Sequence, residues 1–389
     1  MKNSDLFQRV AAYSQRPLHM PERDLILLEG GEPHFATPPH IIEAMTKALQ
    51  DGYTHYPPGA GDSELREALA TRVAAIAGTP WTANGIYITH GAAAACNAAI
   101  MAFVNPGDRV VLPNPTYSLH ADQVIAAGGI PVFCTLAKDF HLDLAELENA
   151  AEGATMLVLT NPSNPTGVVY SREELAGLAE IANRHDLVVV SDEVYHNHVF
   201  DGFKYTSALA IPELRDRLIY TQTFGKSYAM TGWRIGYMAG PVEMMKACRT
   251  VHRTLAGSVN TAVQRAALAA LDTPAEVLEE MRLGYQANRD LVQEHLSGLR
   301  GVSMQLPEAA FYTFVKVDLG VTSAELVELA ASKGVTVRSG AEYGPDGEGF
   351  IRIAFCVPSE VLREGLIRLR ELFEELASSR TGTTETILA

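Results

Sequence analysis

Between Gly85 and Gly240, short apolar runs alternate with segments whose apolar residues recur at helical spacing. Seven runs can be marked: Ile86–Thr89, Arg109–Leu112, Pro131–Thr135, Met156–Thr160, Leu187–Ser191, Leu218–Thr223 and Gly236–Gly240. This alternation predicts βα repetition, with a mostly parallel sheet covered on both faces. Ser171 and Glu174 form a capping-box pattern, which predicts a helix running from there toward His185.

The pattern changes after a long amphipathic helical stretch from Pro274 to Leu299. Four further strands are expected: Val302–Leu306, Phe311–Val317, Val335–Ser339 and Phe350–Ala354. A helix at Ser323–Lys333 and a last helix beyond Ser359 complete an α+β unit. The tail after Ser378 is rich in Thr and Ser, so fraying is expected there.

These patterns predict two domains and an N-terminal segment. Residues 1–40 precede the first regular helix, at Pro39, and are expected to pack with the smaller unit. Residues 41–285 form the large domain, and residues 286–389 form the small C-terminal domain. A chain of 389 residues with 47% apolar composition is long enough for two domains around a sizeable core.

Charge excludes two classes of partner. The chain carries 31 basic and 46 acidic residues, a formal net charge of -15. Such a surface repels phosphate backbones and anionic lipid heads, so neither nucleic acid nor a membrane is an expected partner.

The cysteines and the chain start indicate the compartment. Four cysteines are scattered without a CxxC pair, and they are expected to be reduced, buried thiols: Cys96, Cys134, Cys248 and Cys356. The first residues contain no apolar stretch typical of a signal peptide, and nowhere do about 18 uncharged apolar residues run together. The sequence therefore predicts a cytoplasmic protein.

Candidate chemistry follows the predicted strands, since ligands of α/β sheets lie outside the carboxyl ends of the strands. The run Ile86–Thr89 is followed by His90 and Gly91, a glycine turn that opens an alanine-rich helix. The free amides at such a helix start suit a phosphate, although a glycine there can equally be a simple turn.

Two charged residues follow other strands. Asp192 ends a buried run and needs a positive partner to stay ionised; a pyridinium nitrogen is one such partner, whereas an isolated aspartate there could be a loop cap. Lys226 lies among small and aromatic residues after Leu218–Thr223, where desolvation would lower its pKa and make it nucleophilic toward an aldehyde. Arg234, eight residues on, offers a forked donor for phosphate.

Taken in order, these motifs resemble class I/II aminotransferases of the aspartate aminotransferase superfamily, which have pyridoxal-phosphate (PLP) fold type I. The motifs are Gly30-Gly31-Glu32-Pro33, Asn164-Pro165-Thr166-Gly167, Asp192 with Tyr195, Lys226 with Arg234, and Arg352 in Phe-Ile-Arg-Ile-Ala-Phe. The resemblance covers nearly the whole chain. It implies an α/β fold with a seven-stranded, mostly parallel sheet between helices in a large domain, a smaller α+β domain, and a homodimer.

The resemblance also implies roles around the cofactor ring. Lys226 matches the lysine that forms the Schiff base with pyridoxal 5'-phosphate and then moves the substrate proton. Asp192 matches the residue that keeps the pyridine nitrogen protonated. Asn164 and Tyr195 match donors to the ring phenolate, and Tyr117 matches the aromatic stacked on the ring. The implied catalytic residues are Lys226, Asp192 and Tyr195.

Further matches concern the phosphate and the substrate. The phosphate is expected at Gly91–Ala93, through the amides of Ala92 and Ala93, with the Thr223 hydroxyl and Arg234. Tyr56 matches a tyrosine that reaches the phosphate of the neighbouring subunit. For the substrate α-carboxylate the matching groups are the Arg352 guanidinium, the Gly31 amide and Asn164.

Four features stay ambiguous or depart from the family. His196 and His198 lack a third ligand nearby, so no metal site is expected. The glycines of Gly340–Gly349 suit either a substrate lid or a plain loop. His19 and Met20 lie where the N-terminal segment of the family often covers the site. Tyr343 stands where many relatives have phenylalanine.

The leading hypothesis is transamination between an α-amino acid and a 2-oxo acid. Alternatives are another PLP reaction on an amino acid, namely elimination, cyclisation or oxidation, and, last, a non-catalytic ligand sensor. Ala93 stands where bacterial aspartate aminotransferases that resemble this chain commonly have a lysine for the distal carboxylate, so aspartate is not the expected preferred donor. A protonated histidine, His19, His55 or His90, could supply that charge instead.

Overall fold

The computed structural model of the chain describes residues 4–6, 8 and 25–385. Its largest sheet has seven strands in the order β2-β8-β7-β6-β5-β3-β4. These strands are β2 (Ile86–Thr89), β3 (Arg109–Asn114), β4 (Ile130–Thr135), β5 (Ala154–Thr160), β6 (Val188–Asp192), β7 (Leu218–Thr223) and β8 (Gly236–Ala239). The seven predicted runs are therefore confirmed as the strands of one sheet. All neighbours pair in parallel except β8, which is antiparallel to both β2 and β7.

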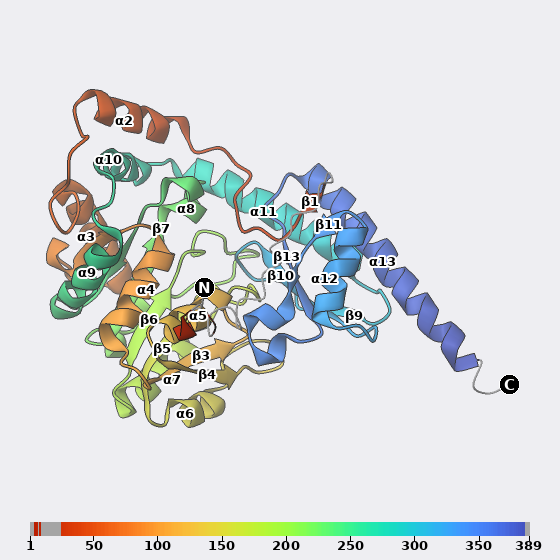
Figure 1. The fold of residues 1–389 in the computed structure, drawn as a ribbon. Helices are drawn as coiled ribbons and strands as arrows, with labels where there is room; N and C mark the ends of the chain where they lie inside the picture. The colour runs from red at the N-terminus through yellow and green to blue at the C-terminus, as the bar shows by residue number, and fades with distance from the viewer. Residues whose placement is uncertain (1–3, 7, 9–24, 386–389) are drawn as a thin grey trace.

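Helices cover both faces of this sheet (Figure 1). They are α2 (Pro39–Gln50), α3 (Ser63–Ala77), α4 (Ala92–Phe103), α5 (Ser118–Ala126), α6 (Leu144–Ala151), α7 (Arg172–Arg184), α9 (Val242–Ala256) and α10 (Thr261–Ala270). Adjacent strand residues face opposite cores: Val189 packs in the cluster shared with α3, α7 and α10, while Val190 packs in the one shared with α4 and α9. Burial on both faces is why these strands read as continuous apolar runs.

The capping box predicted at the start of α7 is present. The Ser171 hydroxyl accepts from the Glu174 amide, and the Glu174 carboxylate accepts from the Ser171 amide, so two amides that the helix leaves unpaired are satisfied. His185 is the C-cap residue, where the sequence predicted the helix to end.

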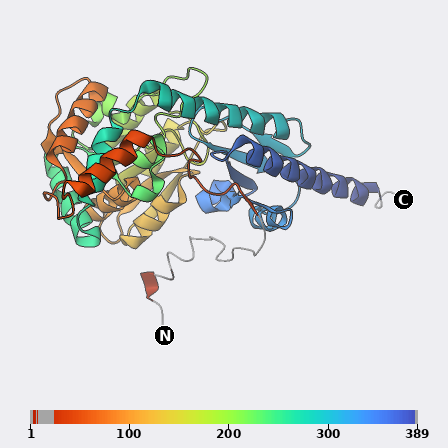
Figure 2. The same cartoon turned by 90° about the horizontal axis from the view of Figure 1, so that it is seen from above.

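A second, smaller unit follows the long helix α11 (Ala275–Leu296). Its four-stranded antiparallel sheet has the order β12-β13-β10-β9. Its elements are β9 (Val302–Met304), β10 (Tyr312–Val317), α12 (Ser323–Ser332), β11 (Val335–Thr336), β12 (Arg338–Ser339), β13 (Phe350–Ala354) and α13 (Ser359–Glu385). Figures 1 and 2 show α11 running from the large unit to the small one and α13 extending away from both.

The N-terminal strand β1 (Ile26–Leu27) pairs in parallel with β11, and Leu28 packs in the core of the small unit. The chain then leaves the small unit and reaches α2, which packs against α10 at the outer edge of the large unit (Figure 1). Residues 9–24, with His19 and Met20, lie outside the described residues. Domain boundaries near residues 40 and 285 stay a prediction.

Short helical elements complete the chain: α8 (Phe224–Ser227) and the 3-10 turns η1 (Ala83–Gly85), η2 (Ala208–Ala210), η3 (Pro212–Leu214), η4 (Thr231–Trp233), η5 (Gly340–Tyr343) and η6 (Pro345–Gly347). All four cysteines are buried and free, as predicted. No helix within the described ranges combines the length and the apolar character needed to cross a membrane.

Two predictions were wrong in detail. The expected strand Val335–Ser339 is split, because β11 joins β1 while β12 joins β13 in a different sheet. The tail after Ser378 does not fray at that point, since α13 continues to Glu385. Adding a residue to an existing helix is far easier than starting one, so the packed first turns of α13, anchored by Leu366 and Phe373, carry the helix into a Thr-rich segment of weak helix propensity.

Candidate active site

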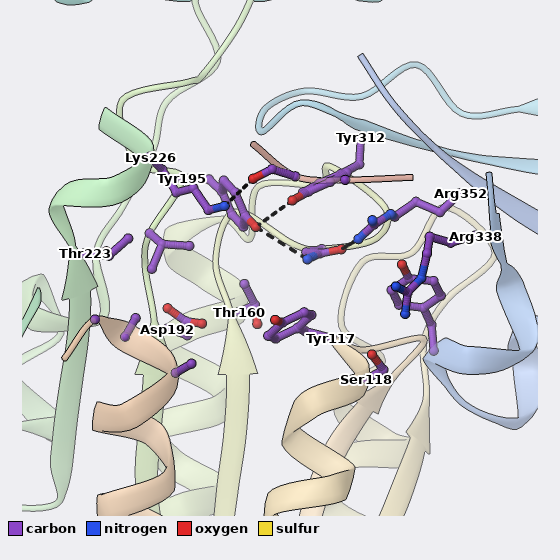
Figure 3. A pocket seen from close by; sticks show the side chains of 18 of the residues that line it. Tyr117, Ser118, Thr160, Asp192, Tyr195, Thr223, Lys226, Tyr312, Arg338 and Arg352 are labelled. Carbon is purple, nitrogen blue, oxygen red and sulfur yellow. Dashed lines mark hydrogen bonds between the residues drawn. The ribbon is translucent and has the colours of Figure 1, made fainter. Parts of the chain in front are cut away.

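A cavity of about 290 Å³ lies at the carboxyl ends of β5, β6 and β7, between the large sheet and the small unit (Figure 3). Every site residue predicted from the sequence lines it, with the exception of Tyr56. Those residues are Gly31, Gly91, Ala92, Ala93, Tyr117, Asn164, Asp192, Tyr195, Thr223, Lys226, Arg234 and Arg352. The cavity is further lined by Glu29, Gly30, Ser118, Thr160, Val194, Tyr312, Arg338 and Tyr343.

Lys226 lies in the single turn of α8, which begins where β7 ends. Its ammonium is removed from water and donates to the Gly31 carbonyl oxygen, and it lies 5.6 Å from the centre of the Phe311 ring. Burial lowers the pKa of Lys226 to about 8. A substantial fraction of this amine is therefore neutral and nucleophilic at the pH of a cell.

Asp192 ends β6 beside Thr160, its partner at the end of β5. The carboxylate is 5% exposed and accepts from the Thr221 hydroxyl at 3.4 Å. Its nearest basic side chain is His120, at 3.9 Å, but burial lowers the pKa of His120 to about 4, so this ring is neutral. Burial raises the pKa of Asp192 to about 7. Among the described residues this carboxylate thus lacks a charged partner in contact, and a cationic ligand nitrogen would supply one.

The glycine turn before α4 forms a place for an anion. Gly91 is the N-cap with a positive φ of 86°, and no side chain caps the helix. The Arg234 guanidinium lies against the turn and donates to the His90 carbonyl oxygen at 3.4 Å. Gly236 must be glycine, because a Cβ there would lie 2.8 Å from the Gly91 Cα. Open amides and an arginine together match a phosphate.

His90, the residue before this turn, is engaged by a second histidine. The His90 amide donates to His252 Nε2 at 3.3 Å, so this nitrogen carries no proton, and His252 Nδ1 pairs with the Tyr87 hydroxyl at 3.0 Å. Burial and then the charge of Arg234 lower the pKa of His90. His90 is therefore a poor source of the cation that Ala93 does not provide.

Hydrogen bonds connect the two sides of the cavity (Figure 3). Asn164 donates to the Tyr195 hydroxyl at 3.4 Å and accepts from the Arg352 guanidinium at 3.0 Å. The Tyr195 and Tyr312 hydroxyls share a hydrogen bond of 3.1 Å. Tyr117 is the N-cap residue of α5, with its ring edge-on to His120 at 5.4 Å.

Arg352 comes from β13 and is 5% exposed. Its guanidinium donates to Asn164 and to the Glu29 carbonyl oxygen, at 2.5 Å, and lies 4.1 Å from the centre of the Tyr312 ring. Its Nε has no partner, and no acidic side chain pairs with it in the described part of the chain. A buried guanidinium in this state calls for a carboxylate from a ligand.

Residues 28–37, here named the strap, run through the site. The Glu29 and Gly31 carbonyls accept from Arg352 and Lys226. Gly31 has no space for a side chain, since a Cβ would lie 1.7 Å from the Tyr312 hydroxyl oxygen. The Thr37 hydroxyl donates to the Ala229 carbonyl oxygen at 2.6 Å. The strap thus contacts both the Arg352 guanidinium and the Lys226 amine, the two groups of the cavity that a ligand would meet.

Tyr56 lies outside this cavity. It is 93% exposed and lines a second cavity of about 790 Å³ that also includes His55, His90 and Arg234. Arg234 lines both cavities, so the second one adjoins the turn before α4.

Sequence reasoning missed Tyr312 and Arg338. Tyr312 bonds Tyr195 and stacks on Arg352, and Arg338 is a Cα partner of Arg352 on the neighbouring strand. The one available signal for Arg338 was a charged residue inside the apolar run Val335–Ser339.

The other ambiguous features have ordinary partners. His196 meets the Gln222 amide at 2.9 Å, and His198 meets the Lys226 carbonyl oxygen at 3.3 Å. The glycine segment Gly340–Gly349 is fastened to the large unit, because the Thr116 amide donates to the Tyr343 carbonyl oxygen at 2.8 Å.

A lysine with a lowered pKa, a buried carboxylate awaiting a cation and an anion-binding turn on this fold define a class of protein: enzymes that hold pyridoxal phosphate and act on amino acids. Comparison with known proteins narrows the class. The family model "Aminotransferase class I and II" matches residues 23–369.

The chain is 36% identical to an aspartate aminotransferase of Pyrococcus abyssi over 361 residues, which covers 91% of this chain and 92% of that protein. It is also 36% identical to aromatic-amino-acid aminotransferase 2 of Thermococcus litoralis, covering 90% and 92%. The solved structure of an aromatic aminotransferase from Pyrococcus horikoshii is similar with a TM-score of 0.88 at 33% identity, covering 95% of this chain and 99% of that one.

The chain therefore belongs to the class I and II aminotransferases. It is a PLP-dependent enzyme that transfers an amino group between an amino acid and a 2-oxo acid.

Proposed function

We propose that the cavity beside Lys226 is the transamination site, with the residue roles that the family resemblance implies. Lys226 would hold the cofactor covalently, and Asp192 would face its ring nitrogen. The observation that carries the proposal is that two groups line one cavity: the desolvated Lys226, whose pKa is lowered to about 8, and the buried Asp192 carboxylate, which has no charged partner in contact among the described residues. Asn164 and Tyr195 would hold the ring oxygen, and Tyr117 the ring face.

For the phosphate, support comes from the uncapped start of α4 at Gly91–Ala93 and from Arg234 beside it. Thr223 fits less simply. Its hydroxyl donates to the Ile235 carbonyl oxygen at 3.1 Å, and it accepts from the Gly225 amide. A hydrogen bond from Thr223 to phosphate requires the hydroxyl proton to turn away from Ile235.

When bound, pyridoxal phosphate supplies an electron sink for the carbanion that forms at the substrate Cα. Asp192 keeps that sink effective by stabilising a proton on the ring nitrogen. Lys226 Nζ, in its neutral form, takes the proton from Cα of the bound amino acid. Arg352 and the Gly31 amide orient the α-carboxylate, so that Cα lies next to the lysine.

The working unit is proposed to be a homodimer in the cytoplasm, with Tyr56 reaching the phosphate of the neighbouring subunit. Its support is the position of Tyr56, exposed on a cavity that adjoins the phosphate turn of its own subunit. Two-fold symmetry would make the contact reciprocal. Light scattering under assay conditions tests this, and a fully active monomer would refute it.

The test of the proposed function is Lys226→Ala. Turnover should be abolished, while the cofactor still binds weakly through its phosphate. The readout is the mass of the protein after borohydride reduction: the wild type gains a covalently attached cofactor, and the variant does not. Lys204→Ala, at an exposed lysine that does not line the cavity, is the control and should behave as wild type. A Lys226→Ala protein with near wild-type transamination would show the assignment to be wrong.

A further inference from the structure

Two arginines reach the cavity from neighbouring strands. Arg338 in β12 and Arg352 in β13 are direct Cα partners of an antiparallel pair, so their side chains share one face of the small sheet. Both line the cavity, and Figure 3 shows them entering from the same side. If Arg352 receives the substrate α-carboxylate, Arg338 is the next guanidinium that a substrate side chain can meet.

The two arginines differ in what balances their charge. Arg352 has carbonyl and amide oxygens around it and no acidic side chain among the described residues. Arg338 forms an ion pair with Glu342, whose side chain is only 4% exposed. Glu342 does not line the cavity and holds Arg338 from behind. The carboxylate that Arg352 needs must come from a ligand, whereas the partner of Arg338 is built into the chain.

The Glu342 backbone is fixed in place. It belongs to η5, where a Cβ on Gly340 would lie 2.2 Å from the Gly347 carbonyl oxygen, so the two segments are in close contact. The next residue, Tyr343, is 1% exposed and its carbonyl oxygen accepts from the Thr116 amide. Glu342 bonds Arg338 through Nη2, and Arg338 Nε has no partner among the described residues, so a substrate carboxylate would have to share the guanidinium with Glu342. The charge of Glu342 already balances that of Arg338 and repels a second carboxylate, which weakens such binding.

We propose that Glu342 determines the substrate class by occupying Arg338. The pair makes the side-chain end of the cavity neutral overall, so it favours amino acids with uncharged side chains and disfavours a side-chain carboxylate. Ala93 provides no cation, and His90 is held by His252, so neither reverses this preference. The proposal rests on the proposed function, in which Arg352 takes the α-carboxylate.

The experiment uses two matched substrate pairs, aspartate with asparagine and glutamate with glutamine, and one common 2-oxo acid. Each pair differs by a charge at nearly constant shape. In Glu342→Gln, which keeps the shape of the side chain and frees Arg338, the acid-to-amide ratio of kcat/KM should rise about tenfold or more, mainly through KM for the acid. Adding Arg338→Met to this variant should return the ratio to within a few-fold of wild type.

A binding measurement separates recognition from chemistry. Calorimetric titration of the cofactor-loaded protein with succinate and with succinamate should show tighter succinate binding in Glu342→Gln, and little change for succinamate. Thermal unfolding of each variant checks that it folds. If Glu342→Gln is unstable, the double variant Glu342→Gln/Arg338→Met decides, because it removes both charges of the pair and should leave the ratio within a few-fold of wild type.

The outcomes distinguish two failures. If the wild type transaminates but Glu342→Gln leaves the ratio unchanged or lowers it, the role of Glu342 is overturned. The same holds if the double variant Glu342→Gln/Arg338→Met lowers the ratio sharply below wild type, since Arg338 would then already bind acids in the wild type. If the wild type moves no amino group from any amino acid, the proposed function itself has failed.

Discussion

The two walls of the cavity hold their charges in different ways. On the wall built from the large sheet, Asp192 and Lys226 are isolated by burial, and both have pKa values moved toward neutrality, to about 7 and about 8. On the wall built from β12 and β13, the charged groups that line the cavity are the guanidiniums of Arg338 and Arg352. A proton can therefore move on the first wall, while the second can only hold anions. Asp192 has no cation in contact and Arg352 no acidic partner among the described residues, so a ligand should bring a positive group for the first and a carboxylate for the second.

The largest effect on this difference between the two walls is expected from Asp192→Asn. The substitution keeps the shape but removes the charge that, in the proposed function, holds the ring-nitrogen proton. The catalytic rate should fall roughly a thousandfold or more, which corresponds to several kcal/mol of transition-state stabilisation. Single-turnover kinetics measures it, and a rate within a few-fold of wild type would remove Asp192 from the mechanism.

A second test compares the two arginines directly through the same change. Arg352→Lys keeps the charge but loses the forked geometry, so kcat/KM should fall on the order of a hundredfold for every amino acid, mostly through KM. Arg338→Lys should change kcat/KM of neutral amino acids by less than a few-fold. Equal losses of kcat/KM in the two variants would mean that Arg338 contacts the substrate as Arg352 does, although Glu342 pairs with it.

Tyr56→Phe tests the contact expected across the dimer. It removes one hydroxyl from the phosphate of the neighbouring site, which is worth about 1.5 kcal/mol when the acceptor is charged. The cofactor dissociation constant should rise about tenfold, while the dimer persists. Tyr53→Phe, at another exposed ring of the second cavity, is the matched control. An unchanged dissociation constant would place the Tyr56 hydroxyl away from the phosphate.

The smallest effect concerns the stability of the cofactor-free protein. Burial raises the pKa of Asp192 from 3.8 to about 7, so folding disfavours its charged form. The resulting loss of stability is absent below about pH 4, grows as the pH rises, and is complete above about pH 7. At pH 8 the free energy of unfolding of cofactor-free Asp192→Asn should therefore exceed that of wild type by on the order of 1 kcal/mol or more, and the variant should unfold at a higher temperature. Near pH 4 the two proteins should unfold at the same temperature. A more stable wild type at pH 8 would show that Asp192 already has a cation.

The sequence predicts the large unit well because each of its strands can be recognised from a short stretch of consecutive residues. Each strand of the large sheet is a continuous apolar run, as burial on both faces requires, and the residues that follow β6 and β7 fall at one edge of the sheet. Asp192 and Lys226 could be found from that rule, and the family resemblance added Arg352.

The small unit is harder to predict, because its contacts are distant in sequence. The split between β11 and β12 depends on the partners of each strand, and β1 lies some 300 residues away from β11. Tyr312 takes part in the site through contacts with Tyr195, with Arg352 and with the strap at Gly31, all of them distant in sequence. The balance between Arg338 and Glu342 likewise needs the conformation of η5, which no spacing rule supplies.

The strap also orders events during protein synthesis. The Glu29 carbonyl oxygen meets Arg352, 323 residues further along the chain, while the Gly31 carbonyl oxygen meets Lys226 after 195 residues. When synthesis has reached the end of α10, the strands and helices that share the core of the large sheet have been made, yet Arg352, the proposed partner of the substrate α-carboxylate, is still to be translated. Because domains generally fold as units, N-terminal first, Asp192 and Lys226 can take their places in the large unit before Arg352 is made. β13 therefore supplies the last of the proposed site residues to be synthesised.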